Sequence, residues 1–322
     1  EHFPGNYTGY LYLGKIYAKQ GKQAEAEKQF KRTLEIEPDL VEPRYELLEL
    51  YKEEKNEQKI LNLYQDILER NPNNIRAAME LGLHYYRSGK IDQAEKIFKK
   101  LGQRSAAEFE VIIKLIQLYI DPKKYDDGIV IIEGMLRAVP DSSEINHVAG
   151  IAYYGKKDNA NALKHFKKVA PKSRFYEDAV IHAAYILSEN KQNEEAIKLL
   201  FDAIDHNPDN AEFKYYLGTF YEDAEQYDRA EEFIKQAIEA DPDNPRYYFR
   251  LGVVYDKWDK KEASMATMRK VIELDPKHAN ALNYLGYTYA DLGKNLDEAE
   301  RLIKEALKYK PSDGYITDSL GW

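Results

Sequence analysis

The side chains that could perform chemistry are numerous, but none stands at a spacing that defines a reaction. The chain has seven histidines, and no two of them are four residues apart, as the HxxxH pair of a metal-binding helix requires. Cysteine is absent, which excludes disulfides, thiolate catalysis and cysteine-ligated zinc. The sequence therefore predicts neither a metal site nor a cofactor.

Carboxylates are equally uninformative about catalysis. The chain has 56 Asp and Glu residues against 47 Lys and Arg, and on helices such residues mostly face solvent, so no pair stands out as a general acid and base. The glycine-rich motifs that cradle phosphates, GxxxxGK[ST] and GxGxxG, do not occur. We expect a protein that is not an enzyme, and non-covalent binding remains as its activity.

A regular series of prolines predicts the helices that position these side chains. The spacings are thirty-four residues, twice that number, or thirty-five, and the series is Pro38, Pro72, Pro140, Pro208, Pro242, Pro276 and Pro311. A fixed period of this length is typical of helix-turn-helix repeats. Proline cannot continue a helix, so each of these prolines is expected to end the second helix of a repeat.

Three further columns follow the same period. A small residue in the first helix recurs as Gly14, Gly82, Gly150, Ala184, Gly218, Gly252 and Gly286, and a tyrosine follows most of them three places later. Small residues of the second helix recur as Ala26, Ala94, Ala162, Ala196, Ala230 and Ala299. With these markers the chain resembles the tetratricopeptide-repeat family from Tyr7 to its end. The resemblance implies an all-α fold, a right-handed α-solenoid (superhelix) of about nine to ten repeats.

The repeat register divides residues 1–322, which we expect to form a single solenoid. The predicted repeats are 7–40, 41–74, 75–108, 109–142, 143–176, 177–210, 211–244, 245–278, 279–313 and a partial repeat 314–322. Two junctions are irregular: 101–110 lacks the terminal proline, and the fifth repeat ends early before 171–178. We expect a kink or hinge at each. The chain starts at Glu1 and ends within a first helix, so we expect a fragment of a longer protein.

Charge argues against nucleic acid as a partner, and hydropathy argues against a membrane-spanning segment. A net charge of -9 without a continuous basic stripe argues against nucleic acid. No run approaches the roughly 18 apolar residues that span a bilayer, so no transmembrane segment is expected in this chain. The absence of cysteine suits both the cytoplasm and the periplasm and does not decide the compartment.

The family resemblance also implies where a partner binds. In this family the first helices line a groove, chiefly through their second, fifth, ninth, twelfth and thirteenth positions. The residues that we expect to contact a partner are Tyr45, Met79, Leu83, Tyr86, Ile113, His147, Ile151, Tyr154, Ile181, Tyr185, Tyr215, Phe249 and Tyr287. An aliphatic side chain here is equally consistent with packing on the next helix. Tyrosines favour ligand contact, because a packed ring with a wet hydroxyl suits an interface.

Acidic residues occupy the polar groove positions of the central repeats. They are Glu110, Glu144, Asp178, Glu189, Glu212, Glu222 and Asp223. We expect an acidic central groove that holds an extended peptide or a helix with apolar anchors and basic residues between them. A merely solvated face of an acidic protein is the alternative interpretation. For His147, a half-buried helix residue is a simpler interpretation than a pH sensor.

The C-terminal end carries a narrower resemblance. The segment NYLGYTYADLGKNLDEAERLIKEALKYKPSDGYITDSLGW, from Asn283 to Trp322, looks like bacterial envelope lipoproteins built of many such repeats. That group includes adaptors that present cell-wall hydrolases to a C-terminal processing protease. The resemblance implies a bacterial protein of the periplasm or outer membrane, with the cytoplasm as an alternative. No lipobox cysteine is present.

The leading hypothesis from the sequence is a non-enzymatic scaffold or adaptor that binds a partner protein, with a protease or a cell-wall hydrolase as candidate partners. Two alternatives stay open. The chain could be the scaffolding region of a larger enzyme or of an exopolysaccharide secretion machine, or it could self-assemble through its end faces. The carboxylate clamp that captures chaperone C-termini is disfavoured, because no repeat has lysine at its fifth position together with asparagine at its ninth.

Overall fold

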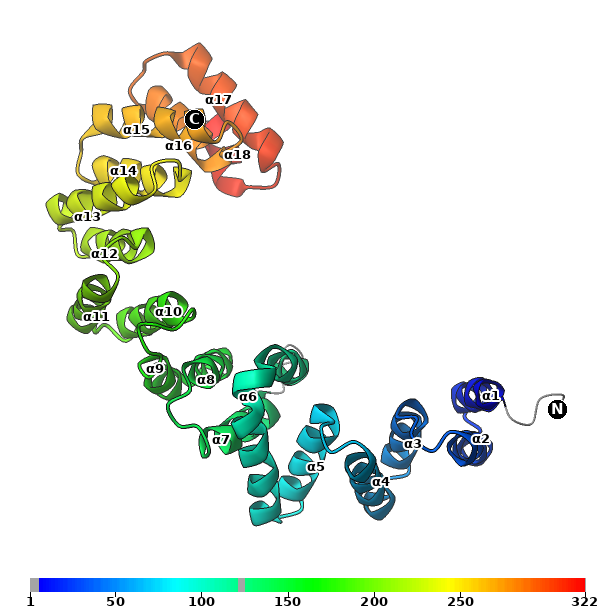
Figure 1. Ribbon diagram of the computed structural model, residues 1–322. Coiled ribbons are helices and arrows are strands. Elements are labelled where there is room, and N and C mark those ends of the chain that lie inside the picture. The colour runs from blue at the N-terminus through cyan, green and yellow to red at the C-terminus, as the bar shows by residue number, and fades with distance from the viewer. Residues whose placement is uncertain (1–5, 121–124, 322) are drawn as a thin grey trace. The chain divides into compact units, whose positions relative to one another are not determined.

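The computed structural model describes residues 6–120 and 125–321, and these residues form helices joined by short turns, with no strand among them. Trp322, the last residue of the predicted partial repeat, lies outside the described residues. By its internal contacts the chain divides into two compact units, Glu1–Lys168 and Val169–Trp322. The single solenoid stays a prediction. Figure 1 shows that each unit is a succession of helices packed on their neighbours in the chain.

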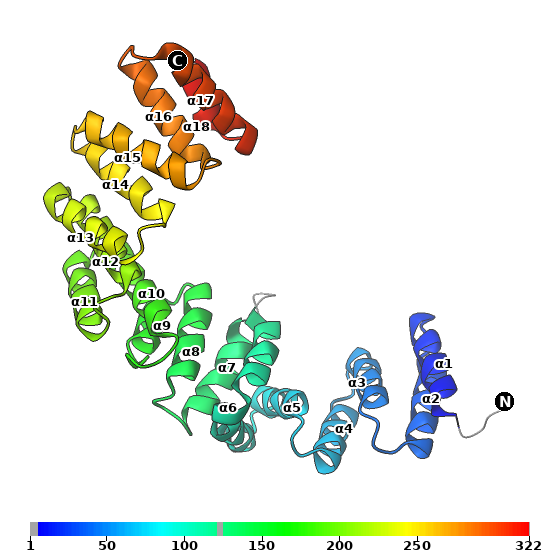
Figure 2. The same cartoon turned by 45° about the horizontal axis from the view of Figure 1, so that its top comes forward.

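Within each unit, helices alternate between the first and second helix of a repeat. The first unit holds α1 (Tyr7–Lys19), α2 (Gln23–Ile36), α3 (Glu42–Glu53), α4 (Glu57–Arg70), α5 (Ile75–Arg87), α6 (Ile91–Ile120), α7 (Tyr125–Leu136), α8 (Ser143–Gly155) and α9 (Asn159–Phe166). The second unit holds α10 (Tyr176–Glu189), α11 (Asn193–His206), α12 (Ala211–Asp223), α13 (Tyr227–Ala240), α14 (Pro245–Lys257), α15 (Lys261–Leu274), α16 (Ala279–Asp291), α17 (Leu296–Tyr309) and α18 (Gly314–Gly321). Figure 2 shows the pairing of α16 with α17 from a second direction.

The glycine column marks the closest approach of the two helices of a repeat. A Cβ added at Gly14 would lie 2.6 Å from the ring of Phe30, and one added at Gly82 would overlap the ring of Phe98. Both rings are buried, 0% and 2% exposed. The large residue of the second helix therefore packs over the glycine of its own repeat.

In the eight repeats whose turn between helices is described, that turn contains a left-handed residue, and these residues recur with the 34-residue period. The residues with positive φ at this position are Gly21, Lys55, Gly89, Lys157, Lys191, Glu225, Asp259 and Gly293. After each of them the backbone N–H of the next residue donates to the carbonyl five residues earlier, as Lys22 N does to Tyr17 O at 2.9 Å. Only three of these eight residues are glycine, so the bond, together with packing of the helices, holds the others in a region that costs about 1 kcal/mol or more.

The third repeat is joined to the fourth in an unusual way. The sequence QRSAAEFE, residues 103–110, contains no proline or glycine, and α6 runs through it for 30 residues. One residue, Glu108, leaves the helical region with φ −124° and ψ 23°, so the helix kinks inside the stretch 101–110. A second helix and the following first helix are thus fused. The other irregular stretch, 171–178, holds turns between α9, which is only eight residues long, and α10. That either stretch acts as a hinge stays a prediction.

Candidate functional site

The first helices carry the residues that the sequence predicted to contact a partner. In the first unit, Met79 and Leu83 are each 1% exposed, so these two side chains belong to the core. Tyr86, one helical turn beyond Leu83 on α5, is 45% exposed. The remaining predicted contacts of this unit are half-buried: Tyr45, Ile113, His147, Ile151 and Tyr154.

In the second unit the same face is more aromatic. Tyr185 on α10 and Tyr287 on α16 are 46% and 42% exposed, whereas Tyr215 on α12 is 5% exposed. Ile181 and Phe249 are half-buried. In this structure Tyr215 does not present its ring to a ligand, because neighbouring rings and a guanidinium cover it. The role of the exposed tyrosines stays a prediction.

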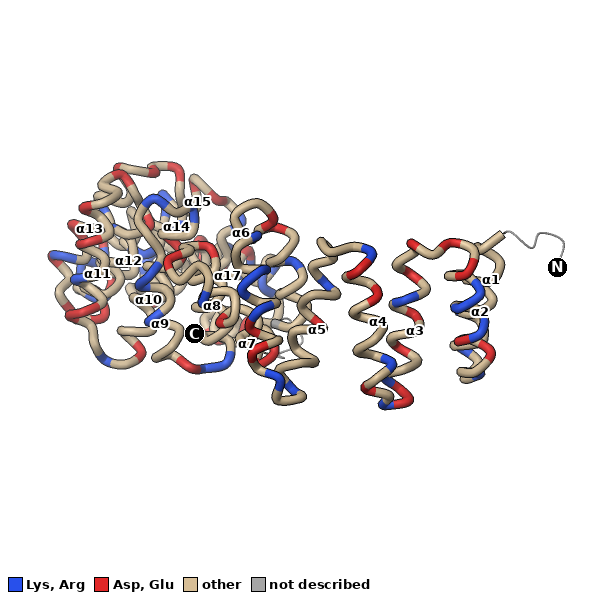
Figure 3. Tube along the Cα trace, turned by 60° about the horizontal axis from the view of Figure 1, so that its bottom comes forward, with Lys and Arg blue, Asp and Glu red and all other residues tan. Residues whose placement is uncertain are grey.

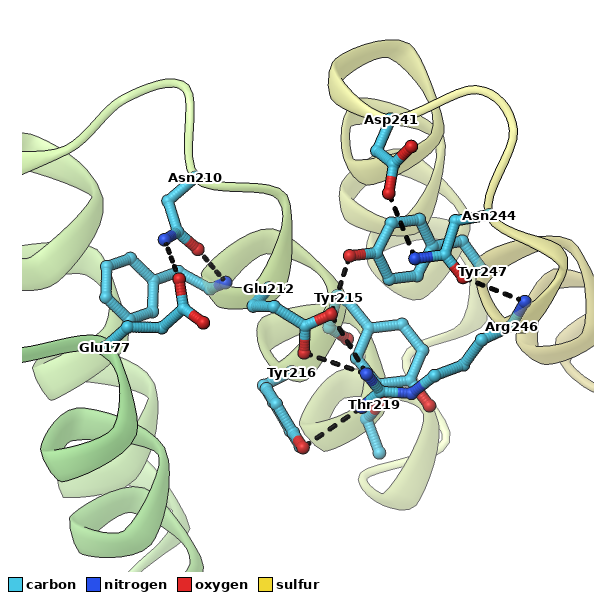
Figure 4. Close-up of polar contacts among 11 residues, drawn as sticks. Glu177, Asn210, Glu212, Tyr215, Tyr216, Thr219, Asp241, Asn244, Arg246 and Tyr247 are labelled. Carbon is cyan, nitrogen blue, oxygen red and sulfur yellow. Dashed lines mark hydrogen bonds and ion pairs between the residues drawn. The ribbon is translucent and has the colours of Figure 1, made fainter. Parts of the chain in front are cut away.

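The guanidinium over Tyr215 belongs to Arg246, the second residue of α14, and Figure 4 shows how it joins α12 to α14. Its Cζ lies 4.1 Å from the centroid of the Tyr215 ring. Its Nη1 donates to both carboxylate oxygens of Glu212 at 2.9 Å, and its Nη2 donates to the hydroxyl of Tyr216 at 3.0 Å. Tyr247 donates its hydroxyl to the same carboxylate at 2.7 Å. The four contacts make one polar and aromatic cluster that bridges successive repeats.

Protonation states in this cluster follow from burial and charge. Burial, and then the hydrogen bond to the Glu212 carboxylate, raises the pKa of Tyr247 above its usual 10, so the phenol keeps its proton and donates. Burial disfavours the charged form of Arg246, but the contacts with Tyr215 and Glu212 outweigh it, so the pKa of Arg246 is raised and the guanidinium stays charged. The cluster is therefore held by charge-assisted hydrogen bonds.

A second carboxylate of the predicted acidic groove is neutralised in the same way. Glu222 is 2% exposed, and its carboxylate lies 3.2 Å from Arg250 Nη1 and 3.0 Å from Lys257 Nζ. Both cations come from α14, on the repeat that follows. Glu212 and Glu222 are thus used within the fold. Of the other acids, Glu144 is half-buried, and the exposed ones are Glu110, Asp178, Glu189 and Asp223.

Sequence reasoning could have found the pair of Glu212 and Arg246. These two residues are separated by one 34-residue period, so they hold the same position in neighbouring repeats, where side chains of opposite sign meet. The buried state of Glu222 had no such signal, because it depends on two cations at different positions of the next helix. Figure 3 shows that acidic and basic residues are interspersed along the helices of the first unit too.

Neither a metal centre nor a membrane span is seen in the ranges that the structure covers. No group of three or more His, Asp or Glu side chains there is arranged to hold a metal ion. Among the described helices, none combines the length and the apolar character that crossing a bilayer demands.

Paired helices stacked in series, with tyrosines recurring on the first helices, define a helical-repeat protein. Sequence profiles described as tetratricopeptide repeat match residues 7–40, 51–110, 189–251, 245–278 and 267–301, together more than half of the chain. The chain therefore belongs to the tetratricopeptide-repeat family, as its sequence predicted. No curated protein sequence matches it.

Solved structures with a similar fold share little sequence with the chain. MamA is 23% identical with a TM-score of 0.44, covering 50% of this chain and 94% of that one. YrrB, described as a TPR protein with an unusual peptide-binding site, is 20% identical with a TM-score of 0.42, covering 53% and 88%. Yeast Tom70 is 14% identical with a TM-score of 0.47, covering 98% and 79%. At these identities the likeness concerns the fold alone.

Proposed function

We propose that this protein is a non-enzymatic scaffold that binds a segment of a partner protein on the face formed by the first helices of its repeats. The observation that carries the proposal is the exposure of Tyr86, Tyr185 and Tyr287, each 42% to 46% exposed and each on a first helix. A tyrosine places a large rigid ring and a hydrogen-bonding tip at an interface at low entropic cost. Proteins of this family are typically non-catalytic.

The proposal also specifies which kind of partner protein to test. The likeness of the segment from Asn283 onward to envelope lipoproteins makes a C-terminal processing protease or a cell-wall hydrolase the first partner to test, and a bacterial envelope the first compartment. Basic residues in the partner would meet Asp223, which is exposed on α12. They would not meet Glu212 or Glu222, whose charges are already compensated.

Site-specific photocrosslinking tests the face directly. A photoreactive phenylalanine analogue is placed at Tyr185 or Tyr287, and in a matched control at Phe201, which is 39% exposed on the second helix α11. Each variant is irradiated in extract from the source cell, and the adducts are identified by mass spectrometry. We expect the same partner protein to be joined to positions 185 and 287 and not to position 201.

Two results would contradict the proposal. Adducts of equal yield at position 201 would show that the partner also contacts the second helices, so the first-helix face would not be the specific binding surface. Absence of a common partner at positions 185 and 287, with circular dichroism showing intact helices, would remove the first-helix face as the binding site.

A further inference from the structure

A cavity in the first unit lies where the end of α5 and the start of α6 meet α7 (Figure 1). Its volume is about 210 Å³, and its apolar lining includes Tyr86, Ile91, Phe98, Ile129 and Val130. An apolar cavity of about 150 Å³ in a protein accepts benzene, so this space can hold one leucine or phenylalanine side chain. Tyr86 and Ile91 are 45% and 41% exposed, so the cavity opens to solvent beside them.

The second helix α7 is apolar at a position where both neighbouring second helices carry lysine. Val130 lies one period after Lys96 and one period before Lys164, and both lysines are exposed whereas Val130 is half-buried. Gly134, one turn further along α7, packs closely against Phe98, so its small size serves the fold. Val130 borders the open cavity instead. Contact of this apolar surface with water is unfavourable, and an apolar group that filled the cavity would remove that cost.

The charged residues of the lining are already engaged within the protein. Arg137 on α7 forms an ion pair with Glu95 on α6. One oxygen of the Glu133 carboxylate accepts a hydrogen bond from the Tyr153 hydroxyl at 2.9 Å and lies 3.0 Å from His165 Nε2. The lining therefore offers neither an unpaired cation nor an unpaired carboxylate group to a ligand.

The residues at the edge of the cavity add no net charge. Lys90 and Asp92, which carry opposite charges, flank the exposed Ile91. At the end of α5, Arg87 pairs with Asp127 at 2.6 Å. A charged group that entered the cavity would lose hydration without gaining an ionic partner, so the site complements an uncharged group.

We propose that this cavity binds one uncharged apolar side chain, of the size of leucine or phenylalanine, from a segment of the partner protein. The inference rests on the proposed scaffold function and names the chemistry of one contact, since Tyr86 is among the three exposed tyrosines that carry that function. Because no ion pair forms or breaks on binding, we expect the affinity of this contact to be independent of salt concentration.

Isoleucine and valine methyl resonances provide the test, because Ile91, Ile129 and Val130 line the cavity. The probes are acetylated amino-acid amides, which present one side chain on an uncharged backbone. We expect acetylphenylalanine amide to shift these signals saturably and to bind at least about tenfold more tightly than the corresponding amides of glycine, aspartate and lysine. The affinity of the phenylalanine probe is expected to be the same in low and in high salt.

Val130 also supplies a matched pair of variants. Val130→Lys gives α7 the residue of both neighbouring second helices and places a charge at the cavity, so we expect the phenylalanine probe to bind at least about tenfold more weakly. Ala266→Lys is the control, because Ala266 is exposed at the same repeat position on α15, and we expect it to leave the affinity unchanged. Ile91→Ser, at a position that is 41% exposed, is a second variant expected to weaken binding. Circular dichroism checks that the variants keep their helices.

Three outcomes would overturn the proposal. They are equal binding of the aspartate or lysine amide, the lack of a saturable shift in the parent protein, and methyl signals that move with protein concentration alone, which would show that a second copy fills the cavity. If the probes fail while positions 185 and 287 still crosslink a partner, the cavity site falls and the scaffold function stands.

Discussion

Gly82 is the residue on which the packing of its repeat depends most directly. Phe98, which covers it, is also held from the other side, because a Cβ added at Gly134 would lie 2.5 Å from Phe98 Cβ. The ring cannot move away in either direction. We predict that Gly82→Ala destabilises the protein by about 1–3 kcal/mol through overpacking, measured by urea unfolding.

Gly9→Ala is the matched control, since nothing lies within 4 Å of a Cβ built at that helical position of α1. We expect it to stabilise the helix by about 0.5–1 kcal/mol. A stabilising effect of Gly82→Ala as well would show that the ring of Phe98 relocates without strain.

His278 gives the second unit a pH-dependent helix start. It is the N-cap of α16, and its Nδ1 accepts a hydrogen bond from the backbone N–H of Ala281 at 3.1 Å. Protonation removes that acceptor, and burial lowers the pKa of His278 below its usual 6.5, against the opposing effect of Asp275. The contribution to stability is therefore full above pH 6.5 and is lost as the pH falls through the folded-state pKa.

Asparagine caps α12 and α14 at the same repeat position, Asn210 and Asn244, and it does not titrate. We predict that His278→Asn matches the parent protein at pH 8 and exceeds it by about 1 kcal/mol at pH 5, measured by urea unfolding followed by tryptophan fluorescence. A difference that does not change between the two pH values would show that the protonated ring finds another way to cap the helix.

Between elements, the cluster of Glu212 and Arg246 couples α12 to α14. A double-mutant cycle with Glu212→Gln and Arg246→Gln is predicted to give a coupling energy of about 1 kcal/mol in urea unfolding, because the carboxylate is only 23% exposed. The pair of Arg301 and Glu305 within α17 is the control, with an expected coupling of about 0.3–0.5 kcal/mol. Equal couplings would mean that the cluster adds nothing beyond a surface ion pair.

The sequence predicted the helices well where one recurring residue type, proline or glycine, determines where a helix ends or how closely two helices pack. Proline and glycine positions follow from local backbone and packing constraints, so the paired helices and their close crossings could be read directly. The kink at Glu108 could be placed only within ten residues, because a stretch of good helix formers does not say where two fused helices change direction. The burial of Tyr215 and Glu222 was missed, since it depends on side chains of the following repeat.

At the scale of the whole molecule, the division into two units predicts two separable unfolding reactions. Repeats contact only their neighbours, so a change in one unit affects the other weakly. Both tryptophans, Trp258 and Trp322, fall in the second unit, whereas circular dichroism reports all helices. We predict that Gly82→Ala moves the dichroism transition and leaves the fluorescence midpoint unchanged. A matching shift in both signals would show that the chain unfolds as one cooperative unit.

The fused helix α6 has a consequence for the chain under tension. A repeat with a turn between its helices can be peeled open one helix at a time when its ends are pulled. Between the third and fourth repeats there is no such turn, because the backbone is helical from Ile91 to Ile120 except at Glu108, where it kinks. We therefore expect these two repeats to yield together under load, with the first opening at Glu108.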